Sequence, residues 1–172
     1  ARHYLTSLDL AAARLSPIDE YERAVGAARC LAHSGASPDA TALAVRAAAV
    51  ARRTDRPDLL ADAVLVLEGR GNQSLELRDA AKSALAGLPA AAHGLRARLH
   101  AQLVNLAFYL DHTGMEEDCS AAEREALAGD DPDAELAALR ARNMLSYGPE
   151  HAALRLEQAG RLGRAAAAAG KP

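Results

Sequence analysis

Apolar residues recur along the chain every three or four positions, in runs that Pro, Gly or short Asp/Ser clusters interrupt at intervals of roughly 15 to 20 residues. An apolar residue at every third or fourth position lies on one face of an α-helix, and the spacing of the breaks corresponds to one helix plus one turn. The pattern therefore predicts about nine helices with short connections. They cover residues 1–15, 17–34, 37–54, 57–69, 74–89, 91–111, 115–129, 132–145 and 149–169.

Several predicted helices begin with residues that suit a helix N-terminus. Ser16-Pro17 and Ser37-Pro38 each combine a hydroxyl that accepts a backbone N–H bond with a proline at the first helical position. The stretch Asp-x-Pro-Asp occurs twice, at Asp55 and at Asp130, each time just before an aliphatic run. We interpret both stretches as helix boundaries, where Asp accepts N–H groups and Pro starts the next helix; a charge-based binding role is the alternative.

The order of large and small residues along these helices resembles that of tetratricopeptide repeats, over residues 17–170. The positions that carry the resemblance form three groups. They are Leu60, Ala63, Val64, Leu67 and Gly71, ended by Pro89; Leu103, Leu106, Ala107, Leu110, Gly114, Cys119 and Ala126, ended by Pro132; and Leu136, Leu139, Ala152, Leu156 and Ala159. The resemblance implies an all-α superhelical array of antiparallel helix hairpins. We expect one helical-repeat domain over 1–172, with N-terminal helices or a cap over 1–35 and irregular repeats over 36–172.

Composition agrees with the helical pattern and excludes several classes of function. Half of the residues are hydrophobic but only 3% are aromatic, and the net charge is −3 with a pI near 6.1. Strands favour aromatic and β-branched residues, and nucleic-acid surfaces are normally basic, so neither a sheet nor direct nucleic-acid contact is expected. There is no run of about 18 apolar residues and no charged-then-apolar leader, so we expect no membrane segment and a cytoplasmic location.

The side chains that could carry chemistry do not form a recognisable active site. The near pairs of soft metal ligands, His112 with Cys119 and His93 with His100, lack CxxC or HxxxH spacing, and a zinc site needs three or four ligands. The stretch that starts at Gly163 fails as a phosphate loop on spacing. Carboxylate clusters such as "MEEDC" lie at predicted helix ends, where they interact with the helix dipole. We therefore expect no enzyme activity, no metal and no cofactor.

A second resemblance is to the helical-repeat region of large ATP-binding LuxR-type and SARP-type bacterial transcription regulators. Three stretches carry it: Asp58-Leu59-Leu60, the residues 95–99, and Tyr147-Gly148-Pro149. The resemblance implies that the chain is a fragment of a longer protein, in which an ATPase module precedes the repeats and a helix-turn-helix domain lies elsewhere. It also implies a non-catalytic interaction or signal-sensing role, with other domains, a protein partner or a small-molecule inducer as ligand. The alternative to this role is a free-standing adaptor that binds partner peptides. We also expect the chain to form a homodimer through a terminal helix.

The surface expected to bind a partner is the concave groove of the array, which the first helix of each hairpin lines. On the repeat alignment the groove residues are Ala101, Val104, Phe108, Asp111, His112 and Met144. Phe108 is the preferred contact residue, and ordinary packing between repeats is its alternative role. Tyr109 and Tyr147 are expected in the core, because the repeat uses aromatic residues there to separate the hairpins.

Overall fold

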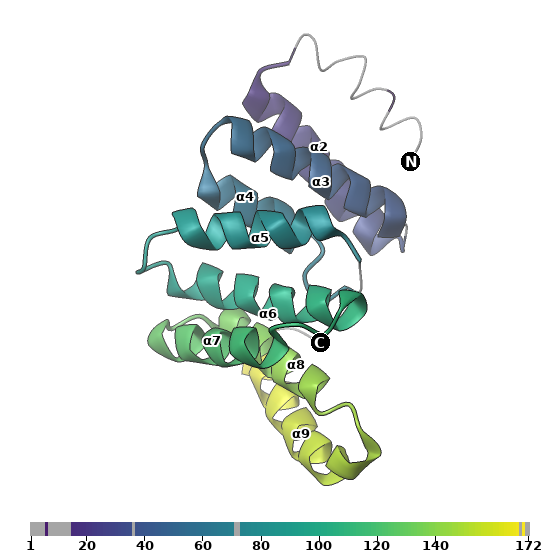
Figure 1. Ribbon diagram of the computed structural model, residues 1–172, viewed down its shortest axis with the longest axis vertical. Coiled ribbons are helices and arrows are strands. Elements are labelled where there is room, and N and C mark those ends of the chain that lie inside the picture. Colours follow the sequence, from purple (N-terminus) through teal and green to yellow (C-terminus); the bar gives the residue numbers. More distant parts are fainter. Residues whose placement is uncertain (1–5, 7–14, 36, 71–72, 169, 171–172) are drawn as a thin grey trace. The chain divides into compact units, whose positions relative to one another are not determined.

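The computed structural model describes residues 6, 15–35, 37–70, 73–168 and 170. In these residues the protein is helical, with eight α-helices, one short 3-10 helix and no strand (Figure 1). The elements are α2 (Pro17–His33), α3 (Ser37–Arg53), α4 (Pro57–Leu65), α5 (Leu75–Gly87), α6 (His93–Leu110), α7 (Met115–Ala128), α8 (Pro132–Leu145), η1 (Pro149–His151) and α9 (Ala152–Ala168). The all-α class is thus confirmed. The helix expected over 1–15 lies outside the described residues, apart from positions 6 and 15.

Local sequence determines where most of these helices begin. The hydroxyl of Ser16 accepts the N–H of Asp19 at 3.2 Å, and that of Ser74 accepts the N–H of Leu77 at 3.2 Å. Pro17 occupies the first turn of α2, where a missing backbone N–H costs nothing. These starts agree with the sequence-based prediction.

The two Asp-x-Pro-Asp stretches differ in how they start a helix. In the second, Asp131 accepts the N–H of Asp133 at 2.9 Å and caps α8. In the first, the capping position is Arg56, which makes no side-chain cap, and Asp55 adopts a left-handed backbone with φ 51°. The prediction that Asp caps both helices is therefore wrong for α4, although proline starts the helix in both.

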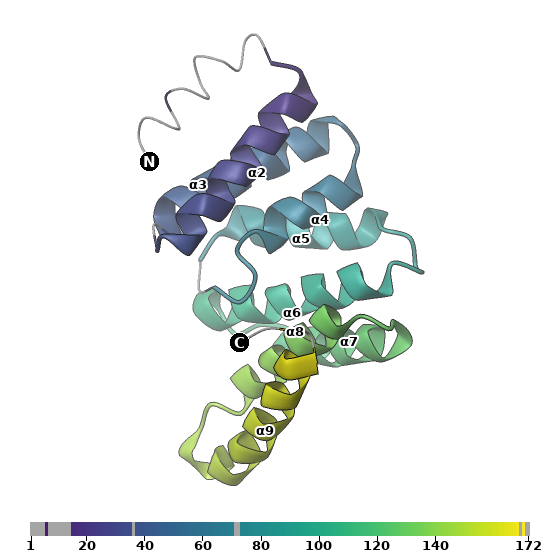
Figure 2. The same ribbon diagram turned by 180° about the vertical axis from the view of Figure 1, so that it is seen from behind.

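The chain divides into two compact units, Ala1–Leu88 and Pro89–Pro172. In the first unit each helix from α2 to α5 contacts the next along the chain, as the view from behind also shows (Figure 2). Its fully buried side chains are mostly small or aliphatic: Ala24, Ala28, Leu43, Ala47, Val50, Val64, Leu67 and Leu77. Small side chains let neighbouring helices approach closely, so the unit is held by close helix contact more than by large side chains.

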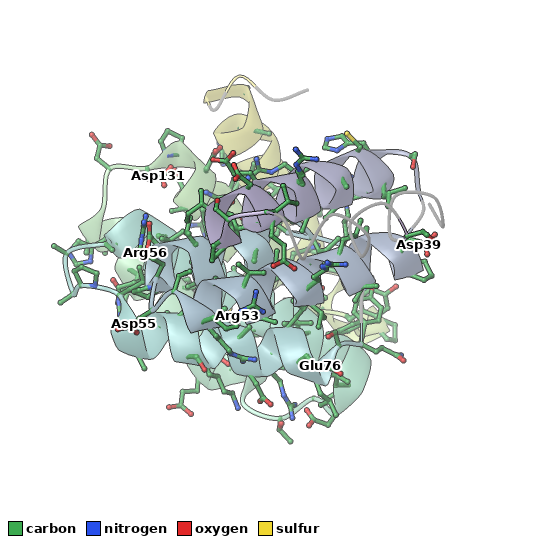
Figure 3. All side chains as sticks on the ribbon, turned by 90° about the horizontal axis from the view of Figure 1, so that it is seen from above. Asp39, Arg53, Asp55, Arg56, Glu76 and Asp131 are labelled. Carbon is green, nitrogen blue, oxygen red and sulfur yellow. The ribbon has the colours of Figure 1, made fainter. Side chains whose placement is uncertain are left out.

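Polar contacts fix the order of helices in the first unit. The Tyr21 hydroxyl of α2 lies within hydrogen-bond distance of two acceptors on α4, the Leu59 carbonyl at 2.8 Å and the Asp62 carboxylate at 2.9 Å. Glu20 of α2 pairs with Arg53 of α3 at 3.0 Å, and Arg53 is labelled in Figure 3. These bonds tie α2 to α3 and α4.

The second unit is built around α6, which contacts both α7 and α8, while α9 packs against α8. A cluster of buried residues from α6, α7 and α8 forms its core: Ala101, Val104, Ala107, Met115, Cys119, Ala122, Ala137, Ala138 and Ala141. At one end of α6, Gly94 faces Asp131 so closely that any side chain at Gly94 would collide with that carboxylate. The start of α8 is therefore held directly against the start of α6.

None of the described helices is both long and apolar enough to cross a lipid bilayer.

Candidate functional site

Four rings gather where α6 ends and α8 gives way to η1. The ring of Phe108 lies 5.2 Å from that of Tyr109, 5.5 Å from that of His112 and 5.5 Å from that of Tyr147, each in an edge-to-face arrangement. We call these four residues the aromatic cluster. The whole chain has one Phe and four Tyr, so three of its five Phe and Tyr residues meet at this point.

The cluster is positioned by two helix ends. His112 follows the end of α6 in a left-handed conformation, with φ 59°, and its N–H bonds to the Ala107 carbonyl at 2.8 Å. The next turn is fixed by Asp111, whose carboxylate accepts the N–H and the hydroxyl of Thr113 at 3.1 and 2.7 Å. A left-handed residue just after a helix is a common way to end it, and histidine adopts this conformation more readily than most residues other than glycine.

The cluster is open to solvent on one side. Phe108 packs partly against the core of the second unit, whereas Tyr109 is exposed and 75% of the Tyr147 surface is accessible. The prediction that Tyr109 and Tyr147 lie in the core is therefore wrong. An exposed group of rings offers both apolar area and π-faces to a partner, the combination that is enriched at protein interfaces.

The six predicted groove residues fall into two environments. Ala101 and Val104 are buried in the core of the second unit. Phe108 and His112 belong to the aromatic cluster, and Asp111 is exposed beside them. Met144 is half-buried, and its sulfur accepts the side-chain N–H of Asn105 at 3.9 Å. The structure thus brings Phe108, Asp111 and His112 to one surface, and whether that surface binds a partner stays a prediction.

A charged network joins α7 to α8 beside this core. Arg142 donates to both carboxylate oxygens of Glu123, at 2.9 and 2.6 Å, and to Glu116 at 2.8 Å. The guanidinium of Arg142 holds the pKa of Glu123 below its ordinary value, and the carboxylate in turn raises the pKa of Arg142. The guanidinium of Arg142 is thus occupied within the protein.

Two of the three histidines considered as metal ligands, His93 and His100, bond to carboxylates. His93 lies 2.8 Å from Glu125, and His100 lies 2.9 Å from Asp118. Burial alone would raise the pKa of Glu125, but hydrogen bonds from Arg96 and His93 outweigh burial and lower it. Within the described residues, no three His, Cys, Asp or Glu side chains are grouped so that they could hold a metal ion.

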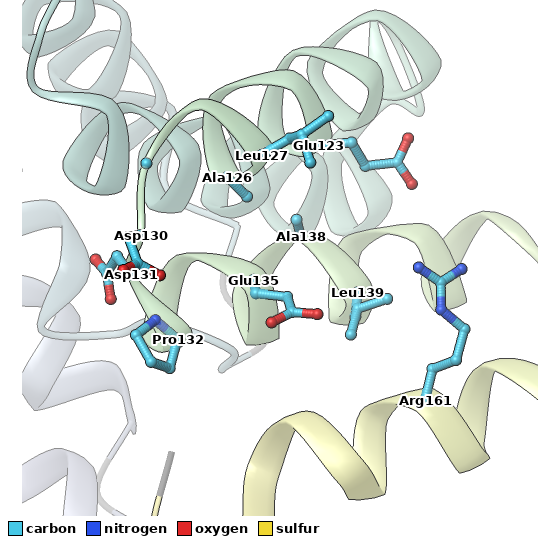
Figure 4. Close-up of a pocket in the computed structure, with 11 residues that line it drawn as sticks. Glu123, Ala126, Leu127, Asp130, Asp131, Pro132, Glu135, Ala138, Leu139 and Arg161 are labelled. Atoms are coloured by element: carbon cyan, nitrogen blue, oxygen red, sulfur yellow. The ribbon is translucent and has the colours of Figure 1, made fainter. Parts of the chain in front are cut away.

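A pocket that the sequence reasoning missed lies between α7, α8 and α9 (Figure 4). Its volume is about 470 Å³. Its lining combines aliphatic side chains with carboxylates and one guanidinium: Glu123, Ala126, Leu127, Gly129, Asp130, Asp131, Pro132, Glu135, Ala138, Leu139 and Arg161. The only signal in the sequence was the second Asp-x-Pro-Asp stretch, whose acidic residues line one side.

Comparison with known proteins adds no relative: no protein-family model, no curated protein and no solved structure matches the chain.

Proposed function

We propose that this chain is a non-catalytic interaction or signal-sensing domain, and that the aromatic cluster is the surface with which it binds an apolar segment of a protein partner. The observation that carries the proposal is the gathering of Phe108, Tyr109 and Tyr147 at one open surface in a chain with so few aromatic residues. Interface residues that dominate binding are enriched in such rings, because each provides a large contact area for little loss of side-chain entropy.

The arrangement of contacts supports a repeat architecture for this domain. Within each unit a helix contacts its neighbour along the chain; in addition α3 contacts α5, and α6 contacts α8. Stacked helix hairpins have this pattern, because each repeat touches only adjacent repeats. We therefore propose an array of tetratricopeptide-like antiparallel hairpins.

The resemblance to ATP-binding LuxR-type and SARP-type regulators extends the proposal to a parent protein. In such a cytoplasmic regulator, the segment or small inducer bound here would favour one state of the ATPase and DNA-binding parts. The reading frame of the gene tests this extension. A phosphate-loop sequence upstream and a helix-turn-helix sequence downstream would support it, and their absence would favour a free-standing adaptor.

Peptide selection tests the binding surface itself. A random-peptide library displayed on phage is panned against the immobilised chain, and the affinity of selected peptides is measured by fluorescence anisotropy. We expect apolar or aromatic peptides whose binding weakens about tenfold in Tyr147→Ser, because truncating a central interface ring costs more than about 1 kcal/mol. Since Tyr147 is largely exposed, this change leaves the fold intact.

Leu156→Ser is the matched control, because Leu156 is just as exposed but lies on α9, outside the aromatic cluster. Selected peptides that bind Tyr147→Ser as tightly as the unchanged protein would contradict the proposal. Native mass spectrometry of freshly purified protein tests the sensing role separately: an excess mass that disappears on denaturation identifies a bound small molecule.

A further inference from the structure

The pocket between α7, α8 and α9 has an aliphatic surface that is unusually open. Leu127, near the end of α7, has 90% of its surface exposed, whereas Leu139 on α8 is buried at the base of the pocket. Ala126 and Ala138 lie between them (Figure 4). A leucine this exposed adds little to the stability of the fold, because its apolar surface stays in water. The pocket therefore has apolar area available for an occupant.

The rim of the pocket carries negative charge that the protein does not neutralise itself. Four carboxylates line it, and one guanidinium, that of Arg161, lies beside Leu139 at the α9 side. Glu123 is already paired with Arg142, and Asp131 caps α8. In the described part of the chain, the carboxylates of Asp130 and Glu135 form neither a hydrogen bond nor an ion pair.

Arg161, the guanidinium that lines the pocket, forms no ion pair with Asp130 or Glu135 in the described part of the chain. Arg161 acts electrostatically on Glu123, and both residues lie at the end of the pocket away from Asp130 (Figure 4). Asp130 and Glu135 lie toward the α7–α8 turn and the first turn of α8. The pocket therefore has an acidic side, an apolar floor and a volume in the range of ordinary ligand sites.

We propose that this pocket binds a basic, aliphatic segment of a protein partner, with an arginine or lysine stem on Leu127 and Leu139 and its charged head at Asp130 and Glu135. Long basic side chains bury their methylene stems along apolar surface while the head reaches polar groups, so one such residue satisfies both parts of the pocket. Arginine fits best, because its planar fork can bond two carboxylates at once.

This site goes beyond the proposed function and does not depend on it. The pocket lies at the start of α8, and Tyr147 of the aromatic cluster follows its end. At 1.5 Å per residue, α8 is about 20 Å long, so the pocket and Tyr147 lie at opposite ends of this helix. A substitution in one site should therefore leave binding at the other unchanged.

Titration of the isotope-labelled full chain with a capped peptide of alternating leucine and arginine, followed by NMR, tests the proposal. A peptide with glutamate in place of arginine, and one with norleucine in place of arginine, serve as controls for charge. We expect saturable shifts confined to residues 123–139 and Arg161 with the arginine peptide, and none with the glutamate peptide. The variant with both Asp130→Asn and Glu135→Gln should bind the arginine peptide about fivefold more weakly.

Leu127→Ser should weaken binding by a similar factor, because it removes the apolar surface without disturbing the core. Its matched control is Leu156→Ser, and Glu157→Gln on the exposed face of α9 is the control for loss of one charge. Tyr147→Ser should leave this binding unchanged, which separates the pocket from the aromatic cluster.

Three binding results would overturn the proposal. They are shifts spread over the whole acidic surface, equal binding of the arginine and norleucine peptides, or affinities in the pocket variants that match those of the controls. Self-association would also overturn it. A doubled mass by light scattering, together with slower amide hydrogen exchange around Leu127, would show that a second copy of the chain covers the pocket.

Discussion

Replacing Arg142 with methionine tests how the second unit is held together. Arg142 on α8 binds Glu123 through both carboxylate oxygens and Glu116 through one, so Arg142→Met removes three charge-assisted hydrogen bonds between α7 and α8. Methionine keeps most of the aliphatic stem. The change in stability therefore reports the polar contacts and not the packing.

The expected magnitude follows from how exposed each partner is. Glu116 is 69% exposed, so its bond to Arg142 is screened by water and contributes roughly 0.3 kcal/mol. The side chains of Arg142 and Glu123 are 25% and 42% exposed, and their two-point geometry is worth about 1 to 1.5 kcal/mol after screening. Arg142→Met should thus lower the free energy of unfolding by about 1.5 kcal/mol at neutral pH. Arg142→Lys keeps the positive charge but not the two-point contact with the Glu123 carboxylate. We therefore expect it to lower the free energy of unfolding by about half as much.

The effect should also depend on pH, with a definite sign. The pKa of Glu123 is lower in the folded protein than its ordinary value. Its contribution to stability is therefore complete above the unfolded-state pKa, about 4.3, and is lost as the pH falls through the folded-state pKa. The difference between the unchanged protein and Arg142→Met should shrink as the pH is lowered from about 5 to 3.

Urea unfolding followed by far-UV circular dichroism measures these differences, and hydrogen exchange locates them. Amides of α7 and α8 should lose protection in Arg142→Met, while those of the first unit keep it. Glu157→Gln, which removes an exposed charge on α9, is the control for a general electrostatic effect. A stability within about 0.3 kcal/mol of the unchanged protein at pH 7, or a difference that stays constant down to pH 3, would refute the reasoning.

Two further substitutions and one chemical titration have expected outcomes. Tyr21→Phe removes the hydroxyl that bonds to Leu59 and Asp62 and should cost about 1 to 2 kcal/mol in urea unfolding; an unchanged midpoint would mean that these bonds add nothing. Thiol titration at pH 7.4 should detect one cysteine in the folded protein and both in urea, because Cys30 is exposed whereas burial raises the pKa of Cys119 to about 12; rapid reaction of both would contradict the structure. Gly114→Ala should lower the melting temperature, since Gly114 has φ 72°, and cost about 1 kcal/mol, while the same change at Gly163, where the space around the glycine is open, should not destabilise.

Helix starts could be predicted from sequence because their causes are local. A serine hydroxyl at Ser16 or Ser74 acts on an N–H three residues later, and a proline at Pro132 cannot lie further inside a helix. The end of α4 was less predictable. The chain leaves the α-helix after Leu65 and continues with i→i−3 bonds, such as Glu68 N–H to the Leu65 carbonyl at 3.0 Å, before it reaches Gly69.

The candidate site could be predicted only in part, since burial depends on which helix covers a residue. Phe108 was identified as a contact residue because it is the only Phe, and it does lie at the edge of an open surface. Tyr147 is expected inside, but among the described residues no helix of the second unit covers it, and three quarters of its surface is exposed. The pocket beside α8 is lined by both Leu127 and Arg161, which are far apart in the sequence. They line the same pocket because α9 packs against α8, and the sequence pattern does not reveal that contact.

The alanine-rich cores of both units limit how this protein can change over time. Residues such as Ala28, Ala47, Ala107 and Ala137 are buried where helices touch. Single-base changes in an alanine codon give only Val, Gly, Ser, Thr, Pro, Asp or Glu. Each of these is damaging at a tight helix contact: valine overpacks, glycine weakens the helix, proline breaks it, and the others bury a polar group or a charge. At these positions nearly every available mutation is therefore harmful, so viable sequence variation should concentrate at exposed positions, where the two binding surfaces proposed for the protein also lie.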